Sequence, residues 1–371
     1  MNEKLMRAAR LHELDGRFQI DRIPVPEPRP TDVLVKVAAA GLVHNLRNVL
    51  TIYPKVAPFL PLPKLPAIFG LDTTGVVASV GSLVKTDVKV GDRVYVNPGL
   101  SCGSCEACRR ADPTNCRNFT FMGYFGFGPE SQNQYDAYPY GGFSEYATCP
   151  VGNVVKLPDN LSFEQASRFG YLGTAYAGLR KANFKPGQRL LVNGGTGTLG
   201  VGAVLLGLAM GASKVFATGR DPHRLEKLRQ LDPHRIVPVS SRDGTVAAQA
   251  MEATGGNGVD AMLEALAPGA PASSVMDAFH SLRHGGVAVN VGGVSEALAV
   301  DAGYLMITQR SLVGSLWFTT SEGQDMAQMV EAGTLDLSVF EHKVYSLEEV
   351  NTALVEVDGR DGGFTNFVVR P

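Results

Sequence analysis

The chain has 371 residues and a formal net charge of −2. A chain of this length forms about two or three domains, and its nearly balanced charge excludes a general attraction to nucleic acid or to an anionic membrane surface. No apolar run approaches the ~20 residues of a membrane span, and the charged N-terminal segment lacks an apolar signal core, so we expect a soluble, cytoplasmic protein.

The first 150 residues predict short strands separated by turns. Three runs rich in β-branched residues, at 32–41, 74–81 and 92–99, each end in glycine or proline. This pattern is typical of a barrel-like β domain.

Four of the five cysteines follow one another closely: Cys102, Cys105, Cys108 and Cys116. Four thiolates in one compact lobe, at about residues 99–118, predict a closed tetrahedral zinc site with no open position for water or substrate. An iron–sulfur cluster remains an alternative because spacing alone does not identify the metal, whereas nothing else in the chain indicates the secreted context that two disulfides would need. Cys149 stands apart and is expected to be a buried packing thiol.

The segment after this lobe is rich in aromatic residues, with ten between Phe119 and Tyr146. Its glycine, proline and amide residues favour a loop over a buried strand. We interpret it as a lid or pocket wall for a bulky, apolar small-molecule substrate, and an oligomer interface is the alternative.

From residue 160 the pattern changes to alternating helices and strands. Residues 162–184 predict two short helices with Ser162 as an N-cap, followed by a strand, a glycine turn, an apolar helix and a strand over 189–218. Further strands at 235–240, 258–266, 287–293 and 311–318 complete a doubly wound parallel sheet of about six strands, the form of a dinucleotide-binding domain. We expect residues 160–313 to form this α/β domain, and residues 1–159 and 314–371 to form the β-rich domain that it interrupts.

The glycine turn fits G-x-G-x-x-G with Gly195, Thr196, Gly197, Thr198, Leu199 and Gly200. Because it follows a strand and opens a helix, it predicts a pyrophosphate-binding site at the helix N-terminus. Gly195 is expected to permit the tight turn, Gly197 the approach of the pyrophosphate, and Gly200 the packing of helix on strand.

The end of the next strand indicates which coenzyme binds. A site for NAD places a carboxylate there to bind the ribose hydroxyls, whereas this strand ends in Thr218, Gly219 and Arg220. Arg220, with Arg224 one helical turn later, can pair with a 2′-phosphate, so we expect NADPH. The neighbouring Asp221 leaves open that Arg220 is only a solvated charge.

Together these motifs resemble the zinc-type medium-chain alcohol dehydrogenases over nearly the whole chain. The cysteine lobe, the Gly91–Val94 turn, the Gly141–Tyr146 segment and the coenzyme turn occur in that family's order. The resemblance implies a GroES-like β-rich catalytic domain with a Rossmann domain, a dimer or tetramer, and further coenzyme contacts from Thr174, Val291 and Gly292.

The sequence departs from the family at its catalytic zinc. The three positions that hold this metal in the family are Val43, Leu71 and Gly170, none of which can bind zinc. The remaining zinc is then structural, at one per chain. Asp72 is expected to lie near the altered site or to pair with an arginine such as Arg47.

Without a metal, oxidation of an alcohol loses the strongest stabiliser of the alkoxide that must form. This loss favours reduction by NADPH. Conjugate reduction of an enone or enal is expected, as in zinc-free quinone and enone reductases that the chain resembles. The candidate donors are His44, Asn45, Tyr53 and Tyr171. The alternatives are a zinc-independent carbonyl reductase or alcohol dehydrogenase, and a non-catalytic NADPH-binding protein.

Overall fold

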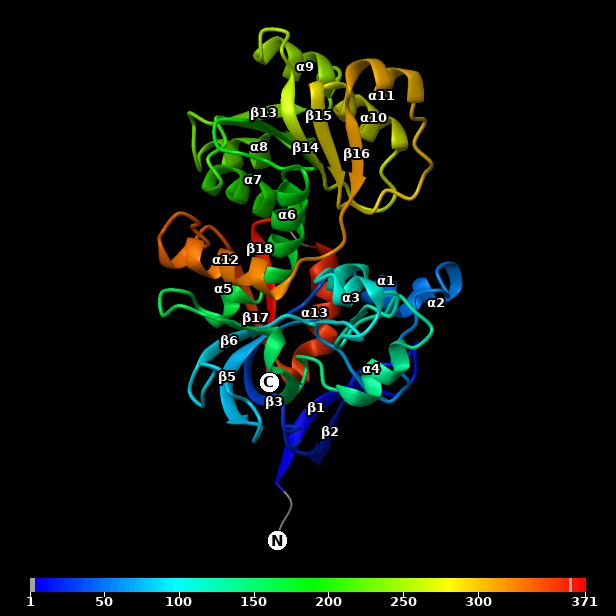
Figure 1. Cartoon of the computed structure of the whole chain (residues 1–371), viewed down its shortest axis with the longest axis vertical. Helices are drawn as coiled ribbons and strands as arrows, with labels where there is room; N and C mark the ends of the chain where they lie inside the picture. The colour runs from blue at the N-terminus through cyan, green and yellow to red at the C-terminus, as the bar shows by residue number, and fades with distance from the viewer. Residues whose placement is uncertain (1–3, 360–361) are drawn as a thin grey trace.

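The computed structural model describes residues 4–359 and 362–371, which form two lobes (Figure 1). The lobe at the top of Figure 1 holds a six-stranded sheet, and the lobe at the bottom holds the remaining sheets. Among the described residues, no helix is both long enough and apolar enough to cross a membrane.

All six strands of the upper sheet are parallel, in the order β13-β12-β11-β14-β15-β16. They are β11 (Arg189–Asn193), β12 (Lys214–Gly219), β13 (Ile236–Ser240), β14 (Val259–Glu264), β15 (Leu282–Asn290) and β16 (Ser311–Gly314). The connecting helices are α7 (Thr198–Ala209), α8 (Pro222–Arg229), α9 (Val246–Ala253), α10 (Ala272–His280) and α11 (Ala302–Thr308). The strand order reverses between β11 and β14, the point at which such sheets bind ligands. The predicted doubly wound sheet is confirmed.

Strand β15 begins five residues before the start predicted from its apolar run. A register shift between Val259 and Ala261 lets Leu282 pair with Val259 before regular pairing resumes at Val287. The polar segment between those two points has no apolar pattern, so the sequence did not reveal it as strand.

The lower lobe is built on a mixed sheet in the order β10-β6-β5-β3-β18-β17, with β9 also paired to β3. Its strands are β3 (Asp32–Gly41), β5 (Asp72–Val80), β6 (Arg93–Val96), β9 (Tyr146–Pro150), β10 (Val154–Lys156), β17 (Glu341–Ser346) and β18 (Thr365–Arg370). Smaller sheets hold β1 (Leu5–Leu11), β2 (Gln19–Pro24), β4 (Ala67–Ile68), β7 (Gly99–Leu100) and β8 (Thr120–Phe121). The pairing of β18 with β3 brings the C-terminal residues back to this lobe.

The other helices cover the lower lobe and join it to the upper one. They are α1 (Leu46–Thr51), α2 (Tyr53–Val56), α3 (Glu106–Arg109), α4 (Ser131–Ala137), α5 (Phe163–Ala166), α6 (Phe169–Lys181), α12 (Thr320–Glu331) and α13 (Val350–Glu356). Short 3-10 turns are η1 (Pro113–Asn115), η2 (Val151–Asn153), η3 (Leu347–Glu349) and η4 (Val357–Gly359). Ser162 caps α5 in a capping box with Gln165, as its position predicted.

Helix α6 lies between the lobes in Figure 1, and one hydrophobic core runs through it into both. Glycines on this helix allow close packing: a Cβ at Gly173 would meet the Phe318 ring at 2.2 Å, and one at Gly178 would meet Leu263 at 2.7 Å. The helix therefore fixes the position of the upper sheet relative to the lower one.

Candidate functional site

A cavity of about 230 Å³ lies where α6 meets both lobes. Its wall contains residues from segments far apart in the chain: Val43, His44, Asn45, Leu71, Asp72, Phe121, Tyr124, Phe125, Gly170, Tyr171, Thr174, Leu199, Val291, Ser315, Leu316 and Trp317. Leu199 and Val291 bring the coenzyme turn and the end of β15 to this wall, so the cavity adjoins the predicted dinucleotide site.

The three positions that the sequence analysis matched to the family's zinc ligands meet at this cavity. Val43, Leu71 and Gly170 all line it, although they come from three separate segments. A Cβ at Gly170 would lie 2.4 Å and 2.6 Å from the two carboxylate oxygens of Asp72. The backbone at Gly170 therefore leaves no room for a ligand side chain at that position.

His44 and Tyr171 form a pair on the cavity wall. Their rings stack with centroids 5.4 Å apart, and the Tyr171 hydroxyl makes a short hydrogen bond with His44 Nδ1. The backbone N–H of His44 also donates to this hydroxyl at 3.3 Å. The structure thus unites two of the four predicted proton donors, 127 residues apart in the chain.

The other two predicted donors form a second pair. Asn45 Nδ2 donates to the Tyr53 hydroxyl at 2.9 Å, but Tyr53 does not line the cavity. The buried Tyr124 does line it, and sequence reasoning did not single it out within its aromatic segment. Burial raises the pKa of Tyr124 well above its usual value, with the nearby Tyr171 and Tyr53 adding to the effect and a hydrogen bond with Asn45 opposing it.

Aromatic rings form one side of the cavity. Phe121 and Phe125 line it from the predicted wall segment, and Trp317 packs on Phe121 with ring centroids 4.6 Å apart. Trp317 has a left-handed backbone with φ +56°, and its indole N–H donates to Asn97 Oδ1 at 2.9 Å. A bulky residue in this conformation is rare, so its surroundings must hold it in place. Trp317 is the chain's one tryptophan, and this rarity could have identified it from the sequence as a candidate residue of the cavity wall.

A buried arginine lies behind Tyr171. Arg168 places its guanidinium 5.7 Å from the Tyr171 ring centroid and 4.1 Å from that of Phe340. It donates to the backbone carbonyl of Thr198, at the start of α7, at 2.8 Å, and to that of Gly363. Arg168 therefore links Tyr171 to the coenzyme turn.

The glycine turn has the shape of a phosphate cradle. The positive φ of +88° belongs to Gly194, one residue before the glycine that the sequence assigned to the tight turn. Gly195 is required by close packing instead, since its Cβ would meet that of Ala217 at 2.8 Å, and a Cβ at Gly200 would meet Gly194 O at 2.1 Å. An added Cβ at Gly197 would meet one atom, Gly194 O at 3.2 Å, which is a tight contact. We expect the pyrophosphate to approach the turn at this glycine.

The end of β12 presents an exposed cation, and the neighbouring carboxylate caps the next helix. Arg220 is exposed there, whereas Asp221 caps α8 by accepting hydrogen bonds from the backbone N–H groups of His223 and Arg224. These N–H groups, Arg224's first, lower the pKa of Asp221. Arg224 Nε lies 3.5 Å from the same carboxylate.

Gly292, at the end of β15, is required by close backbone packing. A Cβ added at this position would lie only 2.7 Å from the carbonyl oxygen of Leu266.

A buried polar network supports the turn from below. Thr218 Oγ1 accepts from Gly194 N and donates to Asn193 Oδ1, and Asn193 Nδ2 donates to Glu264 at 2.6 Å. Burial raises the pKa of Glu264 to about 7, although the Asn193 bond opposes this shift. The network joins the ends of three neighbouring strands beneath the coenzyme turn.

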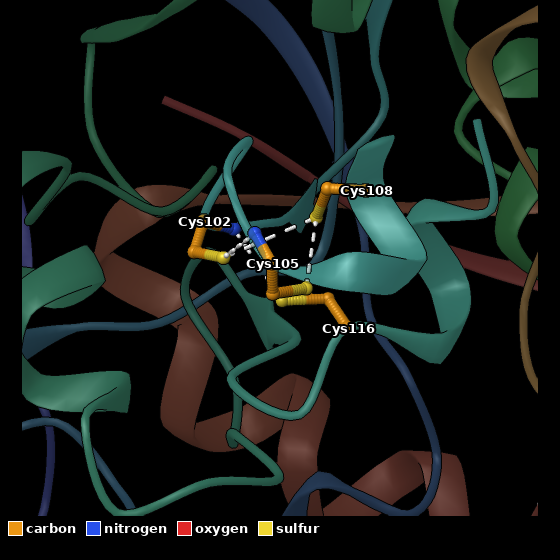
Figure 2. Close-up of side chains that lie close together, drawn as sticks. All are labelled: Cys102, Cys105, Cys108 and Cys116. Carbon is orange, nitrogen blue, oxygen red and sulfur yellow. Dashed lines mark hydrogen bonds between the residues drawn. The ribbon is translucent and has the colours of Figure 1, made fainter. Parts of the chain in front are cut away.

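The four cysteines converge in the lower lobe (Figure 2). Their sulfur atoms all lie within 4.8 Å of one another, and two pairs are 3.5 Å and 4.0 Å apart. A tetrahedral site with four Zn–S bonds of ~2.3 Å needs sulfurs about 3.8 Å apart, so the quartet fits zinc. Backbone N–H groups of Ser104 and Cys105 lower the pKa of Cys102 to about 6, which favours its thiolate.

Within the described ranges, this quartet is the one group of three or more His, Cys, Asp or Glu side chains arranged to hold a metal. Cys149 lies apart in the core and is fully buried, as expected. Asp72 does not pair with Arg47, which bonds to Asp358 instead. The Asp72 carboxylate accepts a hydrogen bond from Tyr95, a residue that no sequence pattern indicated.

Comparisons with known proteins agree with this geometry. Residues 29–159 match the model of the alcohol dehydrogenase GroES-like domain, and residues 198–332 match that of the zinc-binding dehydrogenases. An alcohol dehydrogenase of Geobacillus stearothermophilus is 31% identical over 93% of this chain and 94% of its own. The sorbitol dehydrogenase of Bacillus subtilis is 27% identical over 94% and 92%. The fold matches an NADP-bound structure from Sinorhizobium meliloti 1021 with a TM-score of 0.81 at 23% identity, covering all of both chains.

Replacing a lobe cysteine tests the zinc site. We expect the purified protein to carry one zinc per chain and Cys108→Ser to carry almost none, with a melting temperature lower by roughly 5 °C or more because metal binding is coupled to folding of the lobe. Metal analysis and thermal unfolding measure both effects. Cys149→Ala is the control and should keep its zinc, whereas iron in the wild-type protein, or a second tightly bound zinc, would contradict the assignment.

Proposed function

Because the chain belongs to the zinc-type medium-chain dehydrogenase family, and is therefore an NAD(P)-dependent oxidoreductase, we propose that it is an NADPH-dependent reductase without a catalytic metal. The observation that carries this proposal is the meeting of Val43, Leu71 and Gly170 around one cavity. These residues offer no metal ligand, and Asp72 fills the space beside the third position.

The preference for NADPH rests on the end of β12. Arg220 is exposed there, and the neighbouring carboxylate of Asp221 is engaged with the N-terminus of α8. A 2′-phosphate would meet the positive charge of Arg220 at this point. NADP in the Sinorhizobium meliloti structure of the same fold is in keeping with this preference.

We expect the reacting carbon of the substrate to lie in the cavity beside Tyr171, because this cavity adjoins the coenzyme turn. A reduced nicotinamide coenzyme, held by the turn from Gly195 to Gly200, would supply the hydride. Tyr171 is positioned to deliver the proton, because its hydroxyl is held by His44 and the positive charge of Arg168 behind its ring stabilises the oxygen once the proton has left. His44 can then restore the proton to Tyr171.

The substrate that suits this site is a bulky or apolar unsaturated carbonyl compound. The cavity wall is largely apolar, with the rings of Phe121, Phe125 and Trp317 on one side. Conjugate reduction places the new hydride on the β-carbon and the proton on the α-carbon, so negative charge develops over the enolate instead of on one alkoxide oxygen. Such a reaction depends less on a metal than reduction of an isolated ketone does.

Two substrate panels test the reaction. We expect oxidation of NADPH in the presence of aromatic enones and enals, with little oxidation in the presence of the matched saturated ketones. Turnover of the saturated ketones alone would instead indicate a carbonyl reductase. Stoichiometric NADPH binding with no turnover of either panel would indicate a binding protein.

Removing the proton donor should slow the reaction without affecting coenzyme binding. We expect Tyr171→Phe to lower kcat for an active enone about 10²- to 10⁴-fold, the usual contribution of a positioned acid, and to leave the Kd for NADPH unchanged. Steady-state kinetics and fluorescence titration measure the two effects. Tyr146→Phe is the matched control, and equal kcat values for the Tyr171 and Tyr146 variants would exclude Tyr171 as the donor.

Removing the β12 cation should affect one coenzyme only. Hydrogen bonds to charged groups contribute about 1.5–3 kcal/mol, so Arg220→Ala should raise the KM for NADPH about 10- to 100-fold and leave the KM for NADH nearly unchanged. Arg242→Ala, an exposed arginine after β13, should change neither value. A parallel rise in both KM values for the Arg220 variant would contradict 2′-phosphate recognition.

A further inference from the structure

Among the described residues that line the cavity, Asp72 is the one with a carboxyl group. It lies between the positions of two absent zinc ligands, because it follows Leu71 directly and its oxygens abut the backbone of Gly170. Its side chain is 1% exposed, so it belongs to the interior of the site. Aspartate is seldom buried without a specific partner, and its place here needs an explanation.

The contacts of Asp72 hold the carboxyl in one orientation. The Tyr95 hydroxyl, from β6, donates to Oδ1 at 2.8 Å, and the backbone N–H of Gly170, at the start of α6, bonds to the carboxylate. The positive charge of Arg168, at the same end of α6, lowers the pKa of Asp72. Tyr124, on the aromatic side of the cavity, also interacts electrostatically with Asp72. These groups fix the carboxyl against the cavity wall without a bonded cation.

These contacts also determine its protonation. Burial raises the pKa of Asp72 to about 7, and the bonds from Tyr95 and Gly170 and the charge of Arg168 only partly oppose the shift. A carboxylic acid, unlike a carboxylate, can donate a hydrogen bond. Around neutral pH and below, the cavity thus holds a fixed acidic donor close to the positions where the family holds its metal.

We propose that Asp72, in its protonated form, is a catalytic residue that donates a hydrogen bond to the carbonyl oxygen of the substrate and so replaces the Lewis-acid role of a metal. This inference rests on the proposed function. The hydrogen bond stabilises negative charge on the oxygen while the β-carbon gains hydride, and the Asp72 proton stays on Asp72. The proton that the α-carbon gains comes from Tyr171, so no further oxidant, reductant or proton source is needed.

Infrared spectroscopy of a bound carbonyl tests the hydrogen bond without turnover. The probe is an aromatic enone with a ¹³C-labelled carbonyl, bound to the enzyme with NADP⁺, which cannot reduce it. In the wild type we expect the carbonyl band at low frequency below about pH 6, moving to higher frequency as Asp72 loses its proton through about pH 7. Raising the pH thus removes the donor, and kcat for enone reduction should fall over the same range.

Three variants separate a donor from a merely structural carboxyl. Asp72→Asn keeps an N–H donor that does not titrate, so its band should stay low at all pH values, whereas Asp72→Leu should show the high-frequency band throughout. Tyr95→Phe removes a hydrogen bond that favours the carboxylate form of Asp72. The pH at which the carbonyl band is halfway between its two frequencies (the midpoint) should therefore rise by about one pH unit. Asp32→Asn is the matched control, since Asp32 is equally buried and bonded to Tyr138 but outside the cavity, and it should leave the midpoint unchanged.

The outcomes also distinguish this inference from the proposed function. Enone turnover with a wild-type band that does not change with pH, or an unchanged midpoint in Tyr95→Phe, would overturn the role of Asp72 and leave the reductase intact. A pH-dependent band in a protein that reduces no enone would support the hydrogen bond to the carbonyl and overturn the reductase. Failure of the probe to bind would count against both. If Asp72→Leu does not fold, Asp72→Asn and Tyr95→Phe still decide the matter.

Discussion

The close packing along α6 is the constraint on which the rest of the site depends. One end of the helix meets Asp72 at Gly170, and the next turn meets Phe318 at Gly173, with no space for a Cβ at either position. These contacts fix the direction in which Tyr171 and Thr174 point into the cavity. At the entrance to the same helix, Arg168 reaches the first residue of α7. The catalytic wall and the coenzyme turn are therefore positioned by a single element.

Local patterns in the sequence were enough to predict the class of the fold and the strands of the upper sheet. Apolar strands alternating with helices predicted the parallel sheet, and Ser162 as an N-cap predicted a helix start, because both signals depend on neighbouring residues. The cysteine quartet was equally local. The same reasoning erred slightly at the coenzyme turn, where the left-handed residue is Gly194 and the demand on Gly195 comes from Ala217 on another strand.

The contacts that define the chemistry were not accessible in this way. The pairing of His44 with Tyr171 and that of Asp72 with Tyr95 join residues on different elements, and no periodicity encodes them. The altered family positions led us to expect Asp72 near this site, but not its hydrogen bond with Tyr95 or its contact with the backbone of Gly170. That required the actual distance between Gly170 and Asp72, which only tertiary packing determines.

The contact between Gly170 and Asp72 also limits which substitutions this site can accept. A mutation that placed a cysteine or aspartate at position 170 would force its Cβ into the carboxylate of Asp72, less than 3 Å away. Such an intermediate would be destabilised before it gained any metal, because Val43 and Leu71 would still lack ligand atoms. Building a three-ligand metal site around this cavity would therefore need several substitutions together. The first of them would lower stability without yet providing a site.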